Sequence, residues 1–334
     1  MNRFLATALL WISPGVLMCY GIWFAALFAN PSRDTTGLHR TLPIQCNSMV
    51  FGTSRSAQGV NPEILESELP KSGQWLNFSF TLSVSPWNGA YVDAIQEKLA
   101  CSLEPDEASY FLVFADPWTL DELTGRGEAS WLSADWSNVC GTNIIAHATM
   151  KTNPLDIFGY GSGMDLFGVI ASIPRQIVNW LRDNQATPLR GVQPNGWLPN
   201  TSKRSEVQKQ KAIRRKVNSY RNGKTIGTVW PGSENTQQLE RCVSILGEYA
   251  GPSRIFLVRP PTSSEMRDLE DDWFPNASRE LQRIADKHAI SFIDAHHDWR
   301  KREIRHFNDG HHMSVEGANE FSAFLAKAIE NENK

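Results

Sequence analysis

A serine near the start of the chain and an Asp-x-x-His group near its end have the residue types of a nucleophile, a base and an orienting carboxylate. Asp309 and His312 stand three residues apart in "NDGHHMSVEG", just before an expected helix. At this spacing the carboxylate can accept a hydrogen bond from one ring nitrogen, which leaves the other nitrogen able to take a proton from a hydroxyl. Ser54, in "MVFGTSRSAQG", supplies that hydroxyl, because serine needs such a base to act as a nucleophile. His311 is the alternative base.

The apolar run that ends at Gly52 places Ser54 at the tip of a buried strand. Strands are predicted at Ser48 to Gly52, Gln74 to Phe80, Tyr110 to Ala115, Arg254 to Val258 and Ile290 to Ile293. Helices are predicted between them, at Pro62 to Leu69, Trp87 to Leu99, Asn235 to Tyr249, Asn276 to His288 and Val315 to Ile329. This alternation predicts an α/β fold, a parallel sheet with helices on both faces, and chemistry at the carboxyl ends of the strands.

The stretch from Asp116 to Thr228 is too long for a plain connection and predicts an elaborated insertion between the third and fourth strands. Three tryptophans lie in Trp118 to Trp136, where packing is favoured over a lid or sugar-stacking surface. The apolar stretch Gly159 to Asn184 is interpreted as core, with an interfacial helix or a docking face as the alternative. Lys203 to Lys224 carries nine Lys or Arg residues against one Glu and predicts a solvated helix, with anionic lipid or polymer as the alternative partner.

No charged side chain occurs from Phe4 to Asn30. Because this segment exceeds the roughly 20 residues that span a bilayer and the roughly 7 to 15 of a signal peptide's apolar region, we expect an uncleaved transmembrane anchor at 4–30. A linker at 31–43 and one domain at 44–334, with the insertion at 116–228, then follow. The basic residues flanking the span nearly cancel, so its orientation is open under the positive-inside rule.

Four cysteines lie outside the predicted anchor: Cys46, Cys101, Cys140 and Cys242. An even number of cysteines can form two disulfides in an oxidising compartment, and four buried thiols are the alternative. We favour an extracytoplasmic body, which corresponds to the periplasmic side of a bacterial inner membrane.

The composition excludes several classes of protein. The 334 residues are 41% hydrophobic and 21% charged, as in globular proteins, and the net charge of −3 argues against a nucleic-acid partner. Gly159 to Gly163 lacks the dinucleotide fingerprint. His296, His297 and Asp298 lack a third spaced ligand, so neither a metal ion nor another cofactor is expected.

Gly52-Thr53-Ser54 after the first strand, together with Asp309-x-x-His312 before "MSVEGANEFS", resembles the SGNH (GDSL-like) hydrolase superfamily. The branch most similar in character holds N-terminally anchored bacterial proteins of polymer O-acylation, such as the DltD-like and alginate-acetylation proteins. The resemblance covers most of the chain beyond the predicted anchor in strand order, but it is specific only at the two ends. It implies a three-layer flavodoxin-like fold with Ser54 as nucleophile, His312 as base and Asp309 as its orienting residue.

The resemblance also implies an oxyanion hole made by the Ser54 N–H, an N–H of a second block and an Asn side chain of a third. The second block corresponds to Asn77 to Ser83, which lacks the usual glycine. The third reads "VFADPW", with Asp116 where the family has Gly-x-Asn. An ionised carboxylate cannot donate to an oxyanion, and losing one donor costs about 10² to 10³ in rate.

Three outcomes are open for this third block. Asp116 is protonated through burial, a donor comes from Thr53, Asn77 or Trp118, or the site is slow or inactive. Arg55, beside the nucleophile, can bind an anionic substrate group or pair with Asp116, and the ion pair is favoured.

These observations favour a membrane-anchored serine esterase or O-acyltransferase that acts on an envelope polysaccharide or cell-wall polymer. The expected partners are the membrane, the carbohydrate polymer and a multi-span membrane acyltransferase or another membrane complex. The alternative is a catalytically impaired accessory subunit that keeps the fold and binds a membrane complex, because a fold does not imply a function.

Overall fold

A computed structural model describes residues 44–80, 82, 87–104, 109–120, 192–223, 233–299 and 303–332, together with positions 14 and 18. The predicted linker, most of the predicted anchor and the insertion segment 121–191 lie outside the described residues. The apolar stretch Gly159 to Asn184, Trp131 and Trp136 lie there too. Within the part of the chain that is described, no helix has the length and hydropathy needed to cross a membrane.

The protein has an α/β fold built on a sheet of five parallel strands in the order β2-β1-β3-β4-β5. The strands are β1 (Ser48–Gly52), β2 (Trp75–Ser79), β3 (Phe111–Phe114), β4 (Ile255–Val258) and β5 (Ser291–Ile293). Each falls inside a predicted strand, and the predicted parallel sheet is confirmed. The strand order is that of flavodoxin-like doubly wound sheets, in which ligands bind beyond the carboxyl ends of the strands.

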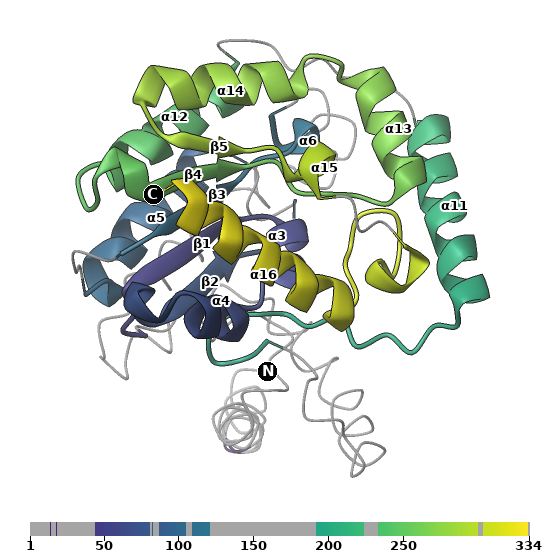
Figure 1. Cartoon of the computed structure of the whole chain (residues 1–334), viewed down its shortest axis with the longest axis horizontal. Helices are drawn as coiled ribbons and strands as arrows, with labels where there is room; N and C mark the ends of the chain where they lie inside the picture. The colour runs from purple at the N-terminus through teal and green to yellow at the C-terminus, as the bar shows by residue number, and fades with distance from the viewer. Residues whose placement is uncertain are drawn as a thin grey trace, which may run out of the picture.

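Alternating strand residues enter two different hydrophobic cores, one on each face of the sheet. Met49 and Phe51 lie in one core with α5 (Gly89–Ser102), α12 (Glu234–Leu246) and α14 (Ala277–His288). Val50 lies in the other core, with α4 (Pro62–Glu68) and α16 (Val315–Glu332). Figure 1 shows α4 and α16 in front of the sheet, α14 along its upper side, and α11 and α13 to its right. The sheet is therefore the middle of three layers.

Several further elements, most of them short, connect the strands and the longer helices and were not predicted. These are α3 (Ser54–Gly59), α6 (Pro117–Leu120), α13 (Ser264–Trp273) and α15 (Ala295–Asp298), with 3-10 turns η2 (Pro70–Ser72), η3 (Pro252–Arg254) and η4 (Ile304–His306). Their sequences are short or rich in polar residues, so a hydrophobic period is hard to recognise in them. They carry Ser54, Arg55, Trp118 and Glu270 of the candidate site.

The predicted basic helix is present as α11 (Glu206–Gly223). Its apolar residues Ile213 and Val217 are buried against Met266 and Leu269 of α13, which stands beside it in Figure 1. Most of its lysine and arginine side chains are exposed. The solvated charged face expected from the sequence is therefore observed.

The segment 193–198 covers the outer edge of β2. The Asn77 N–H donates to the Asn195 carbonyl at 2.8 Å, and the Leu198 N–H donates to the Ala57 carbonyl at 2.9 Å. Gly196 has a φ of +81° and approaches the Asn77 backbone so closely that a Cβ would collide with it. The described end of the insertion thus closes one edge of the sheet.

Candidate active site

The structure brings Ser54, His312 and Asp309 together at the carboxyl edge of the sheet. Ser54 Oγ lies 2.9 Å from His312 Nε2, and His312 Nδ1 lies 2.9 Å from Asp309 Oδ2. If Nδ1 carries the proton and donates it to Asp309, Nε2 is left as the acceptor for the serine hydroxyl. This arrangement has the connectivity of a Ser-His-Asp triad.

A sharp turn at Gly52 presents Ser54 between β1 and α3. Gly52 has a φ of +148°, and a Cβ there would lie 2.7 Å from Phe114 Cβ, so only glycine fits without strain. The Tyr91 hydroxyl of α5 accepts the Gly52 N–H at 2.9 Å and fixes the turn. Thr53 is the N-cap residue of α3, because its carbonyl accepts the first helical N–H, that of Ala57. Ser54 therefore stands at the first position of a helix.

The loop before α16 holds Asp309 and His312 in place. Asp309 Oδ1 accepts the backbone N–H groups of His311 and His312 at 3.0 and 2.9 Å. Burial opposes ionisation of Asp309, but the hydrogen bonds from the His312 side chain and the His311 N–H help to outweigh it, so the pKa of Asp309 lies below its usual value. The orienting residue is thus an ionised carboxylate whose two oxygens both accept hydrogen bonds.

His311 occupies a different environment from its neighbour. Its side chain is buried, packs against His312 with ring centroids 4.2 Å apart, and contacts Tyr220 of α11. Burial lowers the pKa of His311 well below the usual value, so the ring stays neutral beside His312. The imidazole that faces Ser54 is that of His312, and the alternative base predicted at His311 has no support from the geometry.

Arg55 forms a buried ion pair. Its Nη2 lies 2.5 Å from Glu270 Oε1, and its Nε lies 3.4 Å from Asp116 Oδ2. Arg55 and both carboxylate side chains are nearly inaccessible to solvent. Of the two alternatives for Arg55, the ion pair with Asp116 is therefore observed, and it has a second partner in Glu270.

The pKa values of the two carboxyl groups that share Arg55 shift in opposite directions. Burial raises the pKa of Asp116, and the more distant Arg55 offsets this only in part. Burial also opposes ionisation of Glu270, but Arg55 and His296 outweigh it and hold the pKa of Glu270 below its usual value. The direction at Asp116 agrees with the first outcome considered for the third block, a carboxyl whose neutral form is favoured by burial.

The other predicted oxyanion donors are engaged elsewhere. The Asn77 amide nitrogen donates to the carbonyls of Ser56 and Val60, and the side chain is fully buried under α3. The Trp118 N–H donates to Asp116 Oδ1, and its indole N–H donates to Glu270 Oε1 at 2.7 Å. The prediction of Asn77 or Trp118 as a donor is therefore corrected. Thr53 remains next to the nucleophile, where its carbonyl accepts the Ser56 hydroxyl.

Trp118 is a packing residue in this structure. It is 6% exposed, and its ring lies 4.4 Å from that of Tyr220 and 4.9 Å from that of Phe274, measured between centroids. For this tryptophan the packing interpretation holds over the sugar-stacking surface. Glu270, which binds both Trp118 and Arg55, was not predicted, because nothing near it in the sequence indicates partners so distant along the chain.

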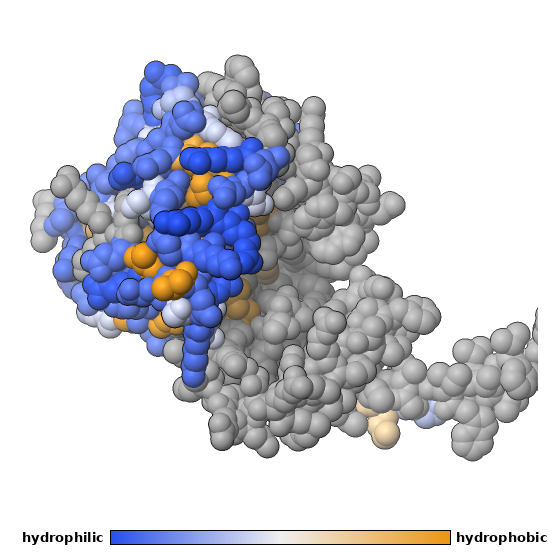
Figure 2. Space-filling model, turned by 90° about the vertical axis from the view of Figure 1, so that its right-hand side faces the viewer, coloured by the Kyte–Doolittle hydropathy of each residue, from blue (hydrophilic) through white to orange (hydrophobic). Residues whose placement is uncertain are grey.

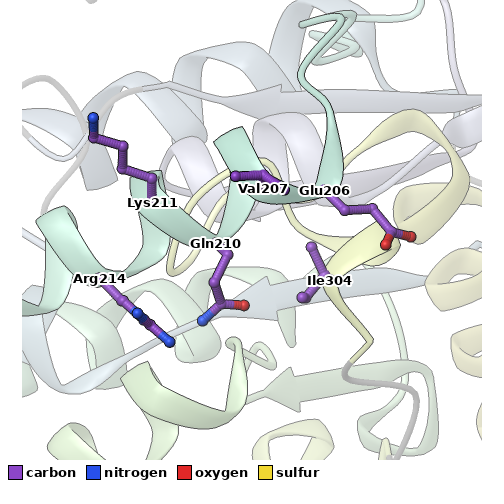
Figure 3. Close-up of a pocket in the computed structure, with 6 residues that line it drawn as sticks. All are labelled: Glu206, Val207, Gln210, Lys211, Arg214 and Ile304. Atoms are coloured by element: carbon purple, nitrogen blue, oxygen red, sulfur yellow. The ribbon is translucent and has the colours of Figure 1, made fainter.

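A pocket of about 450 Å³ lies between α11 and η4, and none of its lining residues belongs to the triad. Figure 3 shows the side chains that line it: Glu206, Val207, Gln210, Lys211, Arg214 and Ile304. Figure 2 shows that the coloured part of this side of the molecule is mainly hydrophilic with small hydrophobic spots. Val207, with 79% of its surface exposed, is one of the exposed apolar residues. The pocket is therefore lined by the apolar side chains of Val207 and Ile304 and by the cationic side chains of Lys211 and Arg214, among others.

A comparison with models of known protein families and a search of curated proteins both find no match for this chain.

Proposed function

We propose that this protein is a membrane-anchored serine esterase or O-acyltransferase of the SGNH hydrolase type that acts on an envelope polysaccharide or cell-wall polymer. One observation carries the proposal. Ser54, His312 and Asp309 form a continuous hydrogen-bonded chain, with both donor–acceptor distances 2.9 Å, at the carboxyl edge of a flavodoxin-like sheet. Such a chain can activate a hydroxyl as a nucleophile.

The proposed reaction has two halves. Ser54 Oγ attacks the ester carbonyl while His312 Nε2 takes the hydroxyl proton, and the imidazolium then gives that proton to the departing alcohol. The acyl group remains on Ser54. Water or a carbohydrate hydroxyl next attacks the acyl carbon, His312 takes its proton, and Ser54 leaves with that proton restored. Asp309 holds the ring and stabilises the imidazolium in both halves.

Stabilisation of the oxyanion is the weakest part of this site. The first intrahelical bond of α3 runs from the Ala57 N–H to the Thr53 carbonyl, so the N–H groups of Ser54 and Arg55 have no acceptor within the helix. They are the nearest backbone donors. Asp116 stands where the family has a donating Asn, and it can donate only while protonated. We therefore expect turnover below that of a site with the full set of donors, by about 10² to 10³.

The polymer substrate and the partners are inferred from the rest of the chain. The predicted anchor at 4–30 confines the site to a membrane surface, where we propose that the domain faces the periplasmic side of a bacterial inner membrane. The exposed cations of α11, such as Lys211 and Arg214, suit an anionic polymer. A multi-span membrane acyltransferase is the proposed source or recipient of the acyl group.

A second candidate function is that of a catalytically impaired accessory subunit. The observation in its favour is that the N–H groups of Asn77 and Trp118 already donate hydrogen bonds to other groups, and that Asp116 is paired with Arg55. In that case the fold and the basic helix would serve binding to a membrane complex.

Labelling with a fluorophosphonate distinguishes the two functions. We expect the purified full chain to be labelled, the Ser54→Ala variant to lose the label, and the control Ser67→Ala, at an exposed serine of α4, to keep it. Absence of label from the folded wild-type chain, or equal label in Ser54→Ala, would refute the catalytic proposal. Labelling without any effect of Ser54→Ala on envelope acylation would refute the polymer substrate and leave an esterase.

A further inference from the structure

Two histidines and a carboxylate converge beyond the carboxyl ends of β4 and β5, apart from the triad. His296 and His297 lie on α15, and Asp271 lies on α13. Asp271 Oδ1 is 2.9 Å from His296 Nε2 and 3.6 Å from His297 Nε2. One ligand atom from each of the three residues lies within 4.8 Å of the other two. The sequence lacks a third ligand spaced near the two histidines, and the fold supplies Asp271 from α13.

The spacing of these atoms is that of metal ligands. Zinc binds histidine nitrogen and carboxylate oxygen at about 2.0 to 2.2 Å in a tetrahedron, which places neighbouring ligand atoms about 3.3 Å apart. The two distances from Asp271 Oδ1 bracket that value. A cation placed among the three atoms needs only a small adjustment of the side chains.

The far nitrogen of His297 is hydrogen-bonded to a carboxylate, and that of His296 lies near one at a longer distance. His297 Nδ1 lies 2.8 Å from Asp294 Oδ2, and a proton held there leaves Nε2 as a lone pair directed toward Asp271. His296 is fully buried, and its Nδ1 lies 3.7 Å from Glu270 Oε2. Histidines that bind metals usually donate their other N–H to a carboxylate, a carbonyl or water, which fixes the ring and raises its basicity.

The local charge also favours a cation. Asp271, Asp294 and Glu270 are carboxylates, and Glu270 is shared with Arg55. Arg259 opposes a cation, since its Nη2 lies 3.5 Å from Asp271 Oδ1. These three carboxylates outnumber the two guanidinium groups near them, those of Arg55 and Arg259. Asp271 and His297 are partly exposed, which gives an ion a route to the buried His296.

Two other groups of possible ligands do not carry the same inference. Asp309, His311 and His312 belong to the candidate triad. His306 lies near Glu316 and Glu320, but the Arg305 guanidinium already pairs with both carboxylates, at 2.8 and 4.0 Å.

We propose that Asp271, His296 and His297 bind a divalent transition-metal ion, with Zn²⁺ as the ion best suited to the donor set. Three protein ligands leave one position for water or another small ligand. The ion would tie α13 to α15 and would hold His296 against Glu270, the residue that binds Arg55 next to the nucleophile. The site is separate from the triad and does not depend on the proposed acyl transfer.

The test uses the full chain in detergent, purified without a histidine tag and stripped with a chelator. Titration with Zn²⁺ should show about one bound equivalent and raise the unfolding temperature, because a ligand that binds only the folded state stabilises it. Titration with Co²⁺ should give the strong visible absorption of a four-coordinate ion.

Three variants decide whether the named residues are responsible. His297→Ala should abolish this binding, and His288→Ala, at a histidine of α14 outside the cluster, should leave it unchanged. Asp294→Asn should weaken it by about 10 to 100-fold, as expected for a residue behind a ligand. Because the His297 side chain is 48% exposed, its replacement should leave the fold intact, which an unfolding curve without metal checks.

The proposal is overturned by equal Zn²⁺ affinity in His297→Ala and wild type, or by absence of stoichiometric binding of Zn²⁺, Co²⁺ and Fe²⁺ to the folded chain. Equal binding of Mg²⁺ or Ca²⁺ would also overturn it, since those ions prefer sites made only of oxygen ligands. Fluorophosphonate labelling of the stripped protein is measured in parallel. Its outcome tests the proposed function separately from the metal site.

Discussion

Ser54 and Arg55 are neighbours in the sequence, yet their side chains meet opposite environments. Ser54 is partly exposed and faces an imidazole, whereas Arg55 is buried between two carboxylates. Consecutive positions at the start of a helix point about 100° apart, which explains the separation. The Ser54 hydroxyl therefore lies next to a fixed buried charge without pairing to it.

The adjacent histidines provide a matched pair of substitutions. His312→Ala should lower acyl release by about 10⁴ to 10⁶, the range seen when the base of a serine triad is removed. His311→Ala removes a neutral packing ring, and a small misplacement of His312 should cost no more than about 10². Release of p-nitrophenol from an acyl ester measures both. Equal losses in the two variants would contradict the assignment of His312 as the base.

The two carboxyls at the site predict opposite responses of stability to pH. The pKa of Asp309 is lowered on folding, so its stabilising contribution is present above the unfolded value of about 3.9 and is lost as the pH falls toward the folded value. The pKa of Asp116 is raised, so its contribution is present below about 3.9 and is lost as the pH rises through the folded value.

Urea unfolding of Asp309→Asn and Asp116→Asn across the acid range checks both signs. The free-energy deficit of Asp309→Asn relative to wild type should be largest at neutral pH and should shrink in acid. The stability of Asp116→Asn relative to wild type should improve as the pH rises. The same sign of pH dependence for both variants would contradict the assigned environments.

Among the elements, the turn from β1 to α3 has the strictest requirement for a glycine, at Gly52. Gly52→Ala places a Cβ at a φ of +148° and 2.5 Å from Ser56 Oγ. We expect a loss of about 1 to 3 kcal/mol in the free energy of unfolding, from backbone strain and crowding. Gly251→Ala is the control, since a Cβ at Gly251 would meet nothing within 4 Å. Thermal unfolding compares the stabilities of the two variants. A similar small effect of both would show that the turn tolerates a side chain.

The regular elements were predictable because their burial leaves a pattern in the sequence. The strands were found because runs such as "MVF" and "IFLV" are buried on both faces. Helix α13 was missed because Met266 and Leu269 are its main apolar residues and Glu270 is buried as an ion-pair partner. Charge pairing across the fold leaves no local pattern, so Glu270 and the third possible metal ligand Asp271 could not be found from sequence spacing.

The triad was predictable for a different reason. Ser54 follows a strand, and Asp309 and His312 precede a helix, so their local contexts were visible in the sequence. The oxyanion donors were less predictable, because hydrogen bonds decide whether a given N–H faces the site. Asn77 had a suitable residue type, but its amide is used to hold α3.

On the scale of the whole molecule, polar groups line the carboxyl edge of an otherwise apolar sheet. Ser54 follows β1, Asp116 follows β3, Glu270 lies on the helix after β4, and His296 follows β5. Arg55 pairs with both Asp116 and Glu270, and His296 Nδ1 lies 3.7 Å from Glu270 Oε2. The parallel sheet brings these distant segments together, because all of its strands end at this edge.

The proposed anchor predicts how the whole chain partitions. The full chain should stay with membranes washed in high salt or alkaline carbonate, because an apolar span is not screened by ions. Lys211→Glu with Arg214→Glu should not release it, since the anchor rather than α11 holds it. Fractionation and immunoblotting measure both. Release of the wild-type chain by salt alone would contradict the anchor and favour attachment through the basic helix.

The separation of 258 positions between Ser54 and His312 has a consequence for biosynthesis. A ribosome makes the hydroxyl long before it makes the imidazole, and α16 must then dock through contacts such as the Ser322 hydroxyl with the Asn61 N–H. A nascent chain therefore carries a serine with no partner to activate it. If Ser54 is the nucleophile, as we propose, acylation can begin only after translation has nearly finished, so the growing polypeptide is not acylated prematurely.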